Sequence, residues 1–227
     1  MKDKSKIGAR AIKRELKTIF QGDYEYIFKK IKPYPVESLI GPVISFFYHK
    51  DQNVKFRAIK LLGRLIDKLY QTNKERARIV MRRLMWNLND ESGGIGWGSP
   101  EAMGEAMALN SDLANEFGNM LISYINMSGN YLEHPELQKG ALWGVYRCGL
   151  TNREIFSEAI NFLPDYFGSS DSETRGLSLL ASINLGFDKK NLHKTFINDT
   201  ESFKVFVDDK FVKYKITDLL NPENKIK

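Results

Sequence analysis

The sequence predicts an all-α fold: a short α-solenoid of about four helical pairs with an N-terminal helical cap and a small C-terminal β-hairpin. Apolar residues recur at helical spacing over residues 5–186. A pattern of charged and then small residues returns within these helices, which indicates a repeat of about 38 residues. Alternation with a period of two appears only near the C-terminus. The chain has 227 residues, 42% of them hydrophobic, so we expect one structural domain with a sizeable core.

Residues 1–34 are expected to form a basic helical cap on the first repeat. In the first helix of this cap Ile12, Leu16 and Ile19 form the stripe that we expect to be buried. A second short helix, YEYIFKKIK, follows, and Pro33 ends the segment because proline cannot continue a helix.

Residues 35–190 are expected to hold the helical pairs. In the second helix of the first pair Asp51 is the predicted N-cap. Its apolar stripe consists of Val54, Ala58, Leu61, Leu62 and Leu65. Charged–small dipeptides recur at steps of 44, 38 and 36 residues, at Arg57-Ala58, Glu101-Ala102, Lys139-Gly140 and Arg175-Gly176. First helices are expected at 36–48, 74–89, 112–126 and 152–166, with the second helices on the inner, concave side.

The pattern D-x-x-V-x-x-x-A-x-x-x-L-G, which begins at Asp51, resembles the second helix of a HEAT repeat. The segments DESGGIGWGSPEAMGE and LEHPELQKGALWGVYR resemble an uncharacterised bacterial group of HEAT-like repeat proteins of the PBS-lyase type. This resemblance covers most of the chain and implies a HEAT-like solenoid, an architecture that generally serves as a protein-binding scaffold. Some bacterial relatives are phycobilin lyases. An irregular helical bundle is the alternative fold.

A second resemblance is to the alkylpurine DNA glycosylases that are built from HEAT-like repeats. Their W-x-x-x-D motif is similar to Trp86-Asn87-Leu88-Asn89-Asp90. The resemblance implies base excision by Asp90, with Trp143 and Arg147 as DNA-holding partners. That family usually has an acid where Asn87 stands, and its groove is basic, whereas this segment of the chain is acidic.

Residues 191–227 are expected to form the β-hairpin and a short tail. The segment SFKVFVDDKFVKYKI alternates on both sides of a predicted turn at Asp209-Lys210. That turn would pair Val207 with Val212, Val205 with Tyr214 and Phe203 with Ile216, and would place Lys204 opposite Lys215.

The composition excludes several classes of protein. A single cysteine, Cys148, excludes an internal disulfide framework and a Cys-rich zinc site. The three histidines lie far apart in the chain, so neither a metal nor a cofactor is expected. No apolar run is long enough for a membrane span, and the N-terminus lacks an apolar signal core. We therefore expect a cytoplasmic protein with no membrane partner.

The formal net charge of +6 conceals a strong asymmetry along the chain. Residues 1–83 carry +13, residues 84–171 carry −9, and residues 172–227 carry +2. Such asymmetry bears on partners rather than on the fold. It favours a cationic or basic partner for the acidic middle and confines any contact with a polyanion to the first third.

The segment 85–107 is expected to carry the functional site. Its glycines permit left-handed backbone and expose amide groups. Ser99 is the predicted N-cap of the next helix, with Pro100 at its first position and Glu101 in its first turn. Glu101 and Glu105 are four residues apart and share a helix face, where like charges are mildly unfavourable. An elaborate connection without function is the alternative reading of the loop.

We expect these acids and several aromatic residues to converge on the concave face. The candidates for catalysis are Asp90, Glu91, Glu101 and Glu105. The candidates for ligand binding are Trp86, Trp97, Glu101, Glu105, Glu133, His134, Trp143 and Arg147. Carboxylates beside aromatic rings suit a cation, a metal or general acid–base chemistry. Alternatively, the tryptophans at helical spacing belong to the core, and His134 caps a helix.

Three functions follow from these residues. The first is an interaction protein that binds a protein, peptide or small ligand at a concave site built from residues 86–105 and 133–147. The second is an enzyme that uses the clustered carboxylates, as a hydrolase or with glycosylase-like activity. The third, which is not favoured, is nucleic-acid binding through the basic first third. Its candidate contacts are Lys6, Arg10, Lys13, Lys17, Arg76, Arg78, Arg82 and Arg83. The oligomeric state stays open.

Overall fold

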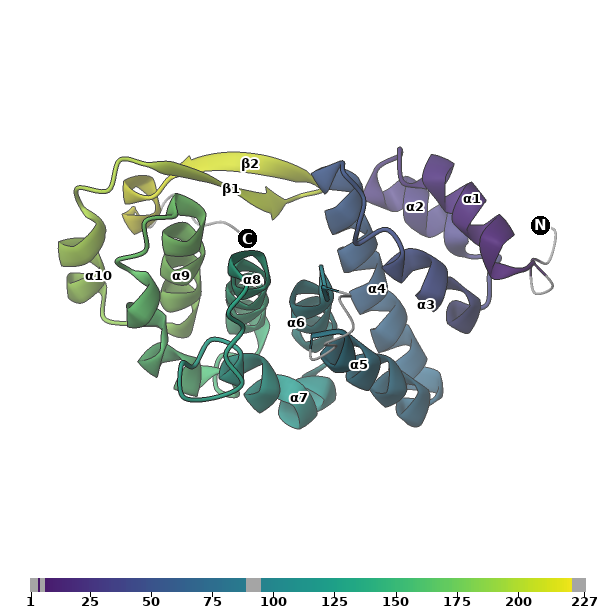
Figure 1. Cartoon of the computed structure of the whole chain (residues 1–227), viewed down its shortest axis with the longest axis horizontal. Coiled ribbons are helices and arrows are strands. Elements are labelled where there is room, and N and C mark those ends of the chain that lie inside the picture. Colours follow the sequence, from purple (N-terminus) through teal and green to yellow (C-terminus); the bar gives the residue numbers. More distant parts are fainter. Residues whose placement is uncertain (1–3, 5–6, 89–94, 222–227) are drawn as a thin grey trace.

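The computed structural model describes residue 4 and residues 7–88 and 95–221 of the chain. The protein is mostly helical and carries one two-stranded antiparallel sheet in its described part (Figure 1). The N-terminal helices are α1 (Ala9–Ile19), α2 (Tyr24–Ile31) and α3 (Val36–Ile44). The predicted stripe of α1 is confirmed: Ile12, Leu16 and Ile19 are all buried.

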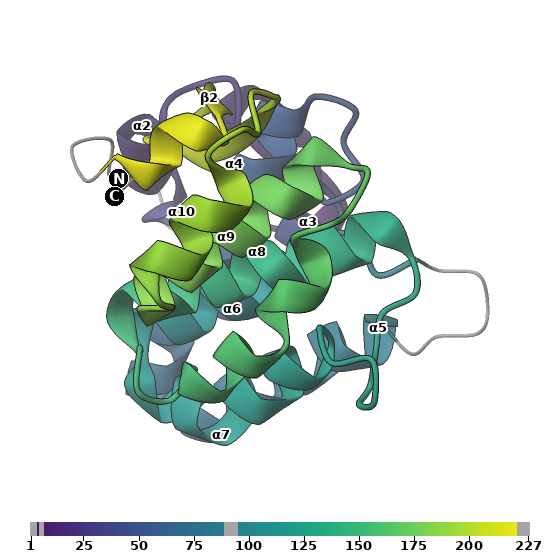
Figure 2. The same ribbon diagram turned by 90° about the vertical axis from the view of Figure 1, so that its left-hand side faces the viewer.

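Four helices stand side by side in a row through the middle of the molecule (Figure 1). They are α4 (Gln52–Thr72), α6 (Ser99–Leu109), α8 (Pro135–Thr151) and α9 (Ser172–Leu185). Each packs against the next in the order α4, α6, α8, α9. The connecting helices α5 (Lys74–Leu88) and α7 (Ser111–Ser123) lie along one edge of this row, on the side away from the sheet (Figure 2). Helices at three of the four first-helix positions are thereby confirmed, as α3, α5 and α7.

Helices α6 and α8 approach each other closely at a pair of glycines. A Cβ atom added to Gly104 would lie 2.4 Å from the Cα of Gly144, so the two backbones touch at this point. The predicted role of small residues agrees with this packing, because Ala58 and Ala102 are completely buried. Close contact between helices here brings the side chains at the start of α6 directly against α8.

The helix starts follow the predicted caps at two of three places. The Asp51 carboxylate accepts a hydrogen bond from the amide of Asn53, as predicted for the start of α4. The side chain of His134 accepts one from the Glu136 amide at the start of α8. At α6, however, the N-cap is Gly98, with φ of +73°, and Ser99 is already helical. The prediction of Ser99 was wrong because glycine takes the left-handed conformation that turns the loop into the helix one residue earlier.

The helix expected over residues 152–166 is not an α-helix. The segment forms two 3₁₀ helices, Ser157–Asn161 and Leu163–Tyr166. Pro164 lies within the second one, and its ring and missing N–H are incompatible with the interior of an α-helix. Short 3₁₀ turns replace it because they need fewer consecutive backbone donors.

The C-terminal part contains a helix that was not expected, α10 (Lys189–Phe196), which crosses the predicted boundary at residues 190/191. The predicted β-hairpin is confirmed, with β1 at Ser202–Val207 and β2 at Lys210–Lys215. A final 3₁₀ helix spans Thr217–Leu220.

The hairpin register differs from the prediction by two residues. The turn lies at Asp208-Asp209, with φ of 46° and 68° respectively. A two-residue turn of this kind needs two left-handed residues, which aspartate tolerates better than lysine. The observed pairs are Val207–Lys210, Val205–Val212, Phe203–Tyr214 and Lys204–Lys213, in place of the four that were expected. A shift of two residues keeps every side chain on its predicted face.

Candidate functional site

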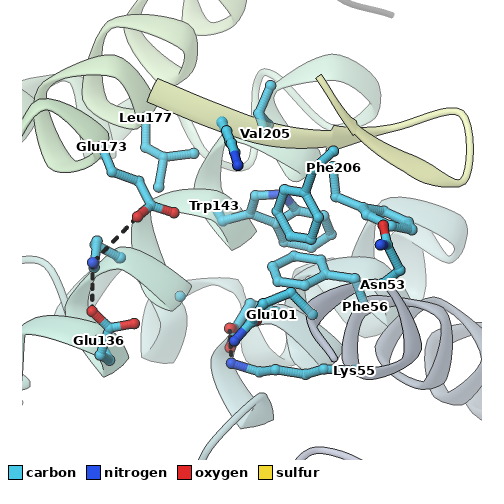
Figure 3. A pocket seen from close by; sticks show the side chains of 15 residues that line it. Asn53, Lys55, Phe56, Glu101, Glu136, Trp143, Glu173, Leu177, Val205 and Phe206 are labelled. Carbon is cyan, nitrogen blue, oxygen red and sulfur yellow. Dashed lines mark hydrogen bonds and ion pairs between the residues drawn. The ribbon is translucent and has the colours of Figure 1, made fainter. Parts of the chain in front are cut away.

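A pocket of about 500 Å³ lies where the N-terminal ends of the four row helices meet the β-hairpin (Figure 3). The hairpin runs across this end of the row from α9 towards α4 (Figure 1). The residues that line the pocket are Gln52, Asn53, Lys55, Phe56, Glu101, Glu136, Lys139, Gly140, Trp143, Glu173, Leu177, Lys204, Val205, Phe206 and Phe211. We call this the hairpin pocket.

Three glutamates enter the hairpin pocket from the first turns of successive helices. Glu101 belongs to α6, Glu136 to α8 and Glu173 to α9. A carboxylate in the first turn is stabilised by the partial positive charge of the helix N-terminus. The local sequence therefore accounts for the position of each acid, and the packing of the helices brings the three together.

Glu101 is the most deeply placed of these acids. The residue is 4% exposed, and its Oε1 lies 3.7 Å from Nζ of Lys55. Its Oε2 has no hydrogen-bond partner among the described residues. This carboxyl rests on Gly140 of α8, where a Cβ atom would come within 2.5 Å of Oε2. Burial raises the pKa of Glu101, and the nearby Lys55 ammonium opposes that rise.

Lys139 joins the other two acids into an ion-pair network. Its Nζ lies 2.5 Å from Glu136 and 3.3 Å from Glu173 (Figure 3), and 4.0 Å from Asp171. Burial raises the pKa of Glu173. Burial alone would lower the pKa of Lys139, but the surrounding carboxylates raise it overall. One ammonium is thus shared by three carboxylates, and each of them has Lys139 as an ion-pair partner.

Aromatic rings form the opposite side of the pocket. Trp143 is 3% exposed and meets Phe56 edge-to-face, with ring centroids 5.5 Å apart. Phe206 and Phe211 of the hairpin pack on the same Phe56 ring at 5.3 and 5.0 Å. The indole Nε1 of Trp143 is buried and has no hydrogen-bond partner among the residues that the structure describes. The wall of the pocket thus holds, besides Oε2 of Glu101, a second buried polar atom without a partner among the described residues.

The hairpin is fastened to the far end of the row by Arg57 of α4. The guanidinium Nε donates to Oδ1 of Asp209 at 3.0 Å, and NH1 donates to the carbonyl of Phe20 at 3.1 Å. One side chain therefore connects the hairpin turn, α4 and the N-terminal cap. Together with the packing of Phe206 and Phe211 on Phe56, this contact holds the hairpin against α4.

The structure brings Glu101 and Trp143 together, as expected, but it does not bring Glu105 and Arg147 into the same pocket. Glu105 is 2% exposed and forms an ion pair with Arg147, whose Nε lies 2.7 Å from its Oε1. Arg147 lies 5.9 Å from the Trp143 ring centroid, outside the lining of the hairpin pocket. The carboxylate of Glu105 is therefore already neutralised, and its role is to join α6 to α8.

Other predicted ligand residues lie outside the hairpin pocket. Trp97 packs edge-to-face on His134, with centroids 4.9 Å apart, and His134 acts as a helix cap. Glu133 is exposed next to it. Trp86 is 78% exposed on α5. It therefore lies neither in the core nor in the hairpin pocket, the two places that were expected for it. Asp90 and Glu91 fall outside the described residues.

The nucleic-acid candidates do not form one free basic surface. Arg10, Lys13 and Lys17 are exposed on α1, whereas Lys6 lies outside the described residues. Arg78 is paired with Glu116 and Arg82 with Glu75, at 2.6 and 2.7 Å. Moreover, α1 packs on α2 and α3, while α5, which carries both arginines, packs on α4 and α6.

Several pocket residues were missed by the sequence analysis. Glu136 lies 35 residues after Glu101, and Glu173 lies 37 residues after Glu136. These intervals are close to the predicted repeat of about 38 residues, so the repeat could have been used to find both acids. No comparable signal marks Lys55 or Lys204, which come from the basic first third and from the hairpin. With Lys139 they give three lysines for three glutamates, so the expected acidic site is balanced in charge.

Among the residues that the structure describes, no three acidic, histidine or cysteine side chains are grouped as a metal site would require. None of the helices in the same described part combines the length and the apolar character needed to cross a membrane.

Comparisons with known proteins give no function. No family model matches the chain. An uncharacterised protein from Archaeoglobus fulgidus is 25% identical over 179 residues, which cover 78% of this chain and 91% of the relative. The crystal structure of an engineered protein is similar over 82% of this chain and 76% of the engineered chain, with a TM-score of 0.50 and 15% sequence identity. The crystal structure of a second engineered protein is similar over 84% of this chain and 46% of the engineered chain, with a TM-score of 0.47 and 13% sequence identity.

Proposed function

We propose that this chain is a HEAT-like helical-repeat interaction protein that holds a peptide segment of a partner protein, or a small ligand, in the hairpin pocket. One observation carries the proposal: a cavity of about 500 Å³ combines an aromatic wall, built from Phe56, Trp143 and the hairpin, with lysine and glutamate side chains from the row helices. A concave site of this volume, with apolar walls and a few polar groups, is typical of ligand binding.

The helical-repeat part of the proposal is supported by the order of packing. The row helices contact one another in chain order, and the intervening helices α5 and α7 lie along one edge of the row. A glutamate recurs in the first turn of α6, α8 and α9. Both features are typical of stacked helical pairs, in which each repeat contacts its neighbours. The engineered protein of TM-score 0.50 supports the helical fold alone.

Catalysis by Glu101 is a second candidate function. A buried carboxyl whose pKa is raised, next to a cavity, is a common property of general acids and bases. The lysine–glutamate network around Lys139 would then bind the polar part of the substrate. Binding takes preference because the structure places no second catalytic group on Glu101 within the described residues other than Lys55 at 3.7 Å.

The proposal is tested by filling the pocket. Asn53 lines its mouth, and its side chain is half-buried, so Asn53→Trp places an indole ring in the cavity. Gln71→Trp is the matched control, because Gln71 is exposed near the other end of the same helix. The assay is thermal stabilisation by a library of small compounds and short peptides. Compounds that bind the hairpin pocket will stabilise the unaltered chain and Gln71→Trp but not Asn53→Trp. Equal stabilisation of all three chains by every hit would refute the assignment of this pocket.

A further inference from the structure

A second cleft, with a volume of about 400 Å³, lies between α2 and α4. None of the residues that line it lines the hairpin pocket. We call it the α2–α4 cleft. Its lining consists of residues in α2 or directly after it and of one residue of α4: Tyr24, Glu25, Phe28, Lys29, Lys32 and Arg64. The cleft therefore combines aromatic and basic side chains from the basic first third of the chain.

Two aromatic rings and one guanidinium pack together in this cleft. Tyr24 and Phe28 are four residues apart, so they share a face of α2, and their ring centroids are 5.0 Å apart. The guanidinium of Arg64 lies over both rings, with its Cζ 4.7 Å from the Tyr24 centroid and 4.9 Å from the Phe28 centroid. Both rings keep part of their surface accessible, and Arg64 is exposed. Aromatic rings and guanidinium planes are the groups on which unpaired nucleic-acid bases stack.

The positive charges of the cleft are not neutralised within the protein. Lys29, Lys32 and Arg64 are exposed, and none of them forms an ion pair with another described residue. One acid, Glu25, stands against these three cations, so the lining carries a net charge of +2. Groups of lysine and arginine side chains without acidic partners attract phosphates.

A fourth cation, Lys60, lies beside the cleft, one turn before Arg64 on α4. Its Nζ is 5.5 Å from the Tyr24 ring centroid, and it forms no ion pair within the described part of the chain. Burial lowers the pKa of Lys60, and the Glu105 carboxylate opposes that shift. A phosphate bound in the cleft would favour the charged form of Lys60 in the same way as Glu105 does.

We infer that the α2–α4 cleft binds single-stranded nucleic acid, with phosphates on the lysines and a base stacked at Arg64 and the two rings. A single strand offers both phosphates and accessible base faces, whereas a duplex keeps its bases stacked inside and uses only the charges. An acidic peptide pairs with the lysines but supplies no base to stack. Binding to an anionic membrane uses apolar side chains that enter the lipid, whereas Tyr24 and Phe28 are half-buried. This site is independent of the function proposed for the hairpin pocket.

The probe is a fluorescein-labelled oligothymidylate of about 15 nucleotides, and its binding to the whole chain is followed by fluorescence anisotropy. We expect a dissociation constant of about 10 µM at about 50 mM salt, and weaker binding as the salt concentration rises. An oligouridylate of the same length compares RNA with DNA. Binding of either strand supports the inference, and the tighter one identifies the preferred sugar. If neither strand binds at protein concentrations up to about 200 µM, the inference is overturned.

Two substitutions of Arg64 separate charge from stacking. Arg64→Gln removes one positive charge and the guanidinium, so it should weaken binding about tenfold. It should also lower the slope of the logarithm of affinity against the logarithm of salt concentration by about 0.7, the value for one phosphate of a single strand. Arg64→Lys keeps the charge but loses the planar group, so it should weaken binding about threefold at an unchanged slope. If Arg64→Lys binds as tightly as the unaltered chain, no base stacks at this position and the inference is wrong.

Arg83→Gln is the matched control, because Arg83 is also exposed and without an ion pair among the described residues, but lies on α5 and outside the cleft. It should change the dissociation constant by less than about twofold. Equal weakening by Arg64→Gln and Arg83→Gln would show that only the total charge matters, and would overturn the assignment to the cleft.

Three competitors test the class of partner: duplex DNA of the same length, an oligoglutamate peptide, and vesicles that contain phosphatidylserine. Duplex DNA has the higher charge density, so electrostatic attraction alone would favour it over the single strand. We therefore expect the single strand to bind at least about threefold more tightly than the duplex because of the stacked base. If the duplex, the peptide or the vesicles bind as tightly as the strand, the inference is wrong. The hairpin pocket is unaffected by any of these results, since the Asn53→Trp experiment tests it separately.

Discussion

Gly104→Ala tests whether the contact between α6 and α8 positions the hairpin pocket. The added Cβ would lie 2.4 Å from the Cα of Gly144 and 3.1 Å from its carbonyl carbon and oxygen. Carbon atoms in contact are separated by about 3.5 Å or more, so the helices must move apart by about 1 Å. The atoms in the way are backbone, and no side chain can rotate to make room. Such a movement also separates Glu101 on α6 from the α8 residues with which it lines the pocket.

The magnitude follows from two opposing effects. Replacing glycine by alanine within a helix favours folding by about 0.5–1 kcal/mol, mainly because the unfolded chain loses freedom. Overpacking costs about 1–3 kcal/mol, and the upper end applies where backbone must shift. We therefore expect Gly104→Ala to lower the free energy of unfolding by about 1–2 kcal/mol. For a chain of this length that corresponds to a melting temperature lower by roughly 2–8 °C.

The assay is urea unfolding followed by far-ultraviolet circular dichroism. Gly118→Ala is the matched control, since Gly118 also lies inside a helix, α7, and its nearest neighbours are side-chain carbons at 3.2–3.4 Å. These side chains can yield, so the control should keep the gain of alanine in a helix and raise the free energy of unfolding by up to about 1 kcal/mol. A Gly104→Ala chain that unfolds at the same or a higher urea concentration than the unaltered chain, with an unchanged slope, would refute the reasoning.

Three further predictions concern single side chains. Burial raises the folded-state pKa of Glu101 above its ordinary value of 4.5, so this group makes the protein less stable as the pH rises from about 4.5. Glu101→Gln should therefore gain stability relative to the unaltered chain as the pH rises above about 4.5, and urea midpoints that stay parallel as the pH rises would contradict it. Arg57→Ala should cost about 1–2 kcal/mol and speed hydrogen exchange in the hairpin, because Arg57 holds Asp209; exchange confined to other segments would speak against the hairpin attachment. Cys148 is completely buried and its pKa is raised by burial, so a thiol reagent should modify it only as fast as the chain opens. Rapid labelling under native conditions would be inconsistent with this packing.

The parts of the fold that depend on local sequence could be predicted. The buried stripe of α1, the cap at Asp51 and the hairpin all follow from residues close together in the chain. The errors in the helix over residues 152–166 and in the hairpin register have local causes that the sequence patterns did not include. Pro164 converts an expected helix into 3₁₀ turns. The φ angles of the two turn aspartates move the hairpin register by two residues.

The candidate site was predictable only in part because its residues come from four helices and two strands. Glu101 and Trp143 were found because an acid in a glycine-rich segment and a tryptophan one repeat later are visible in the sequence. Lys204 and Phe206 were not found, since only the path of the hairpin across the row, from α9 to Phe56 of α4, brings them to the pocket. Trp86 was misjudged, because helical spacing from apolar residues does not show which face of α5 is left uncovered.

Part of the uneven charge along the chain is paired within the molecule. The basic first third and the acidic middle are joined by ion pairs between successive helices. These pairs are Lys55–Glu101, Lys74–Asp112 and Arg78–Glu116. Each pair has one member on either side of the boundary at residues 83/84, where the charge changes sign. Charges that neutralise one another in this way are unavailable to a polyanion or to a basic partner. The exposed lysines and arginines of α1 belong to the part of the asymmetry that is not paired in this way and that still bears on partners.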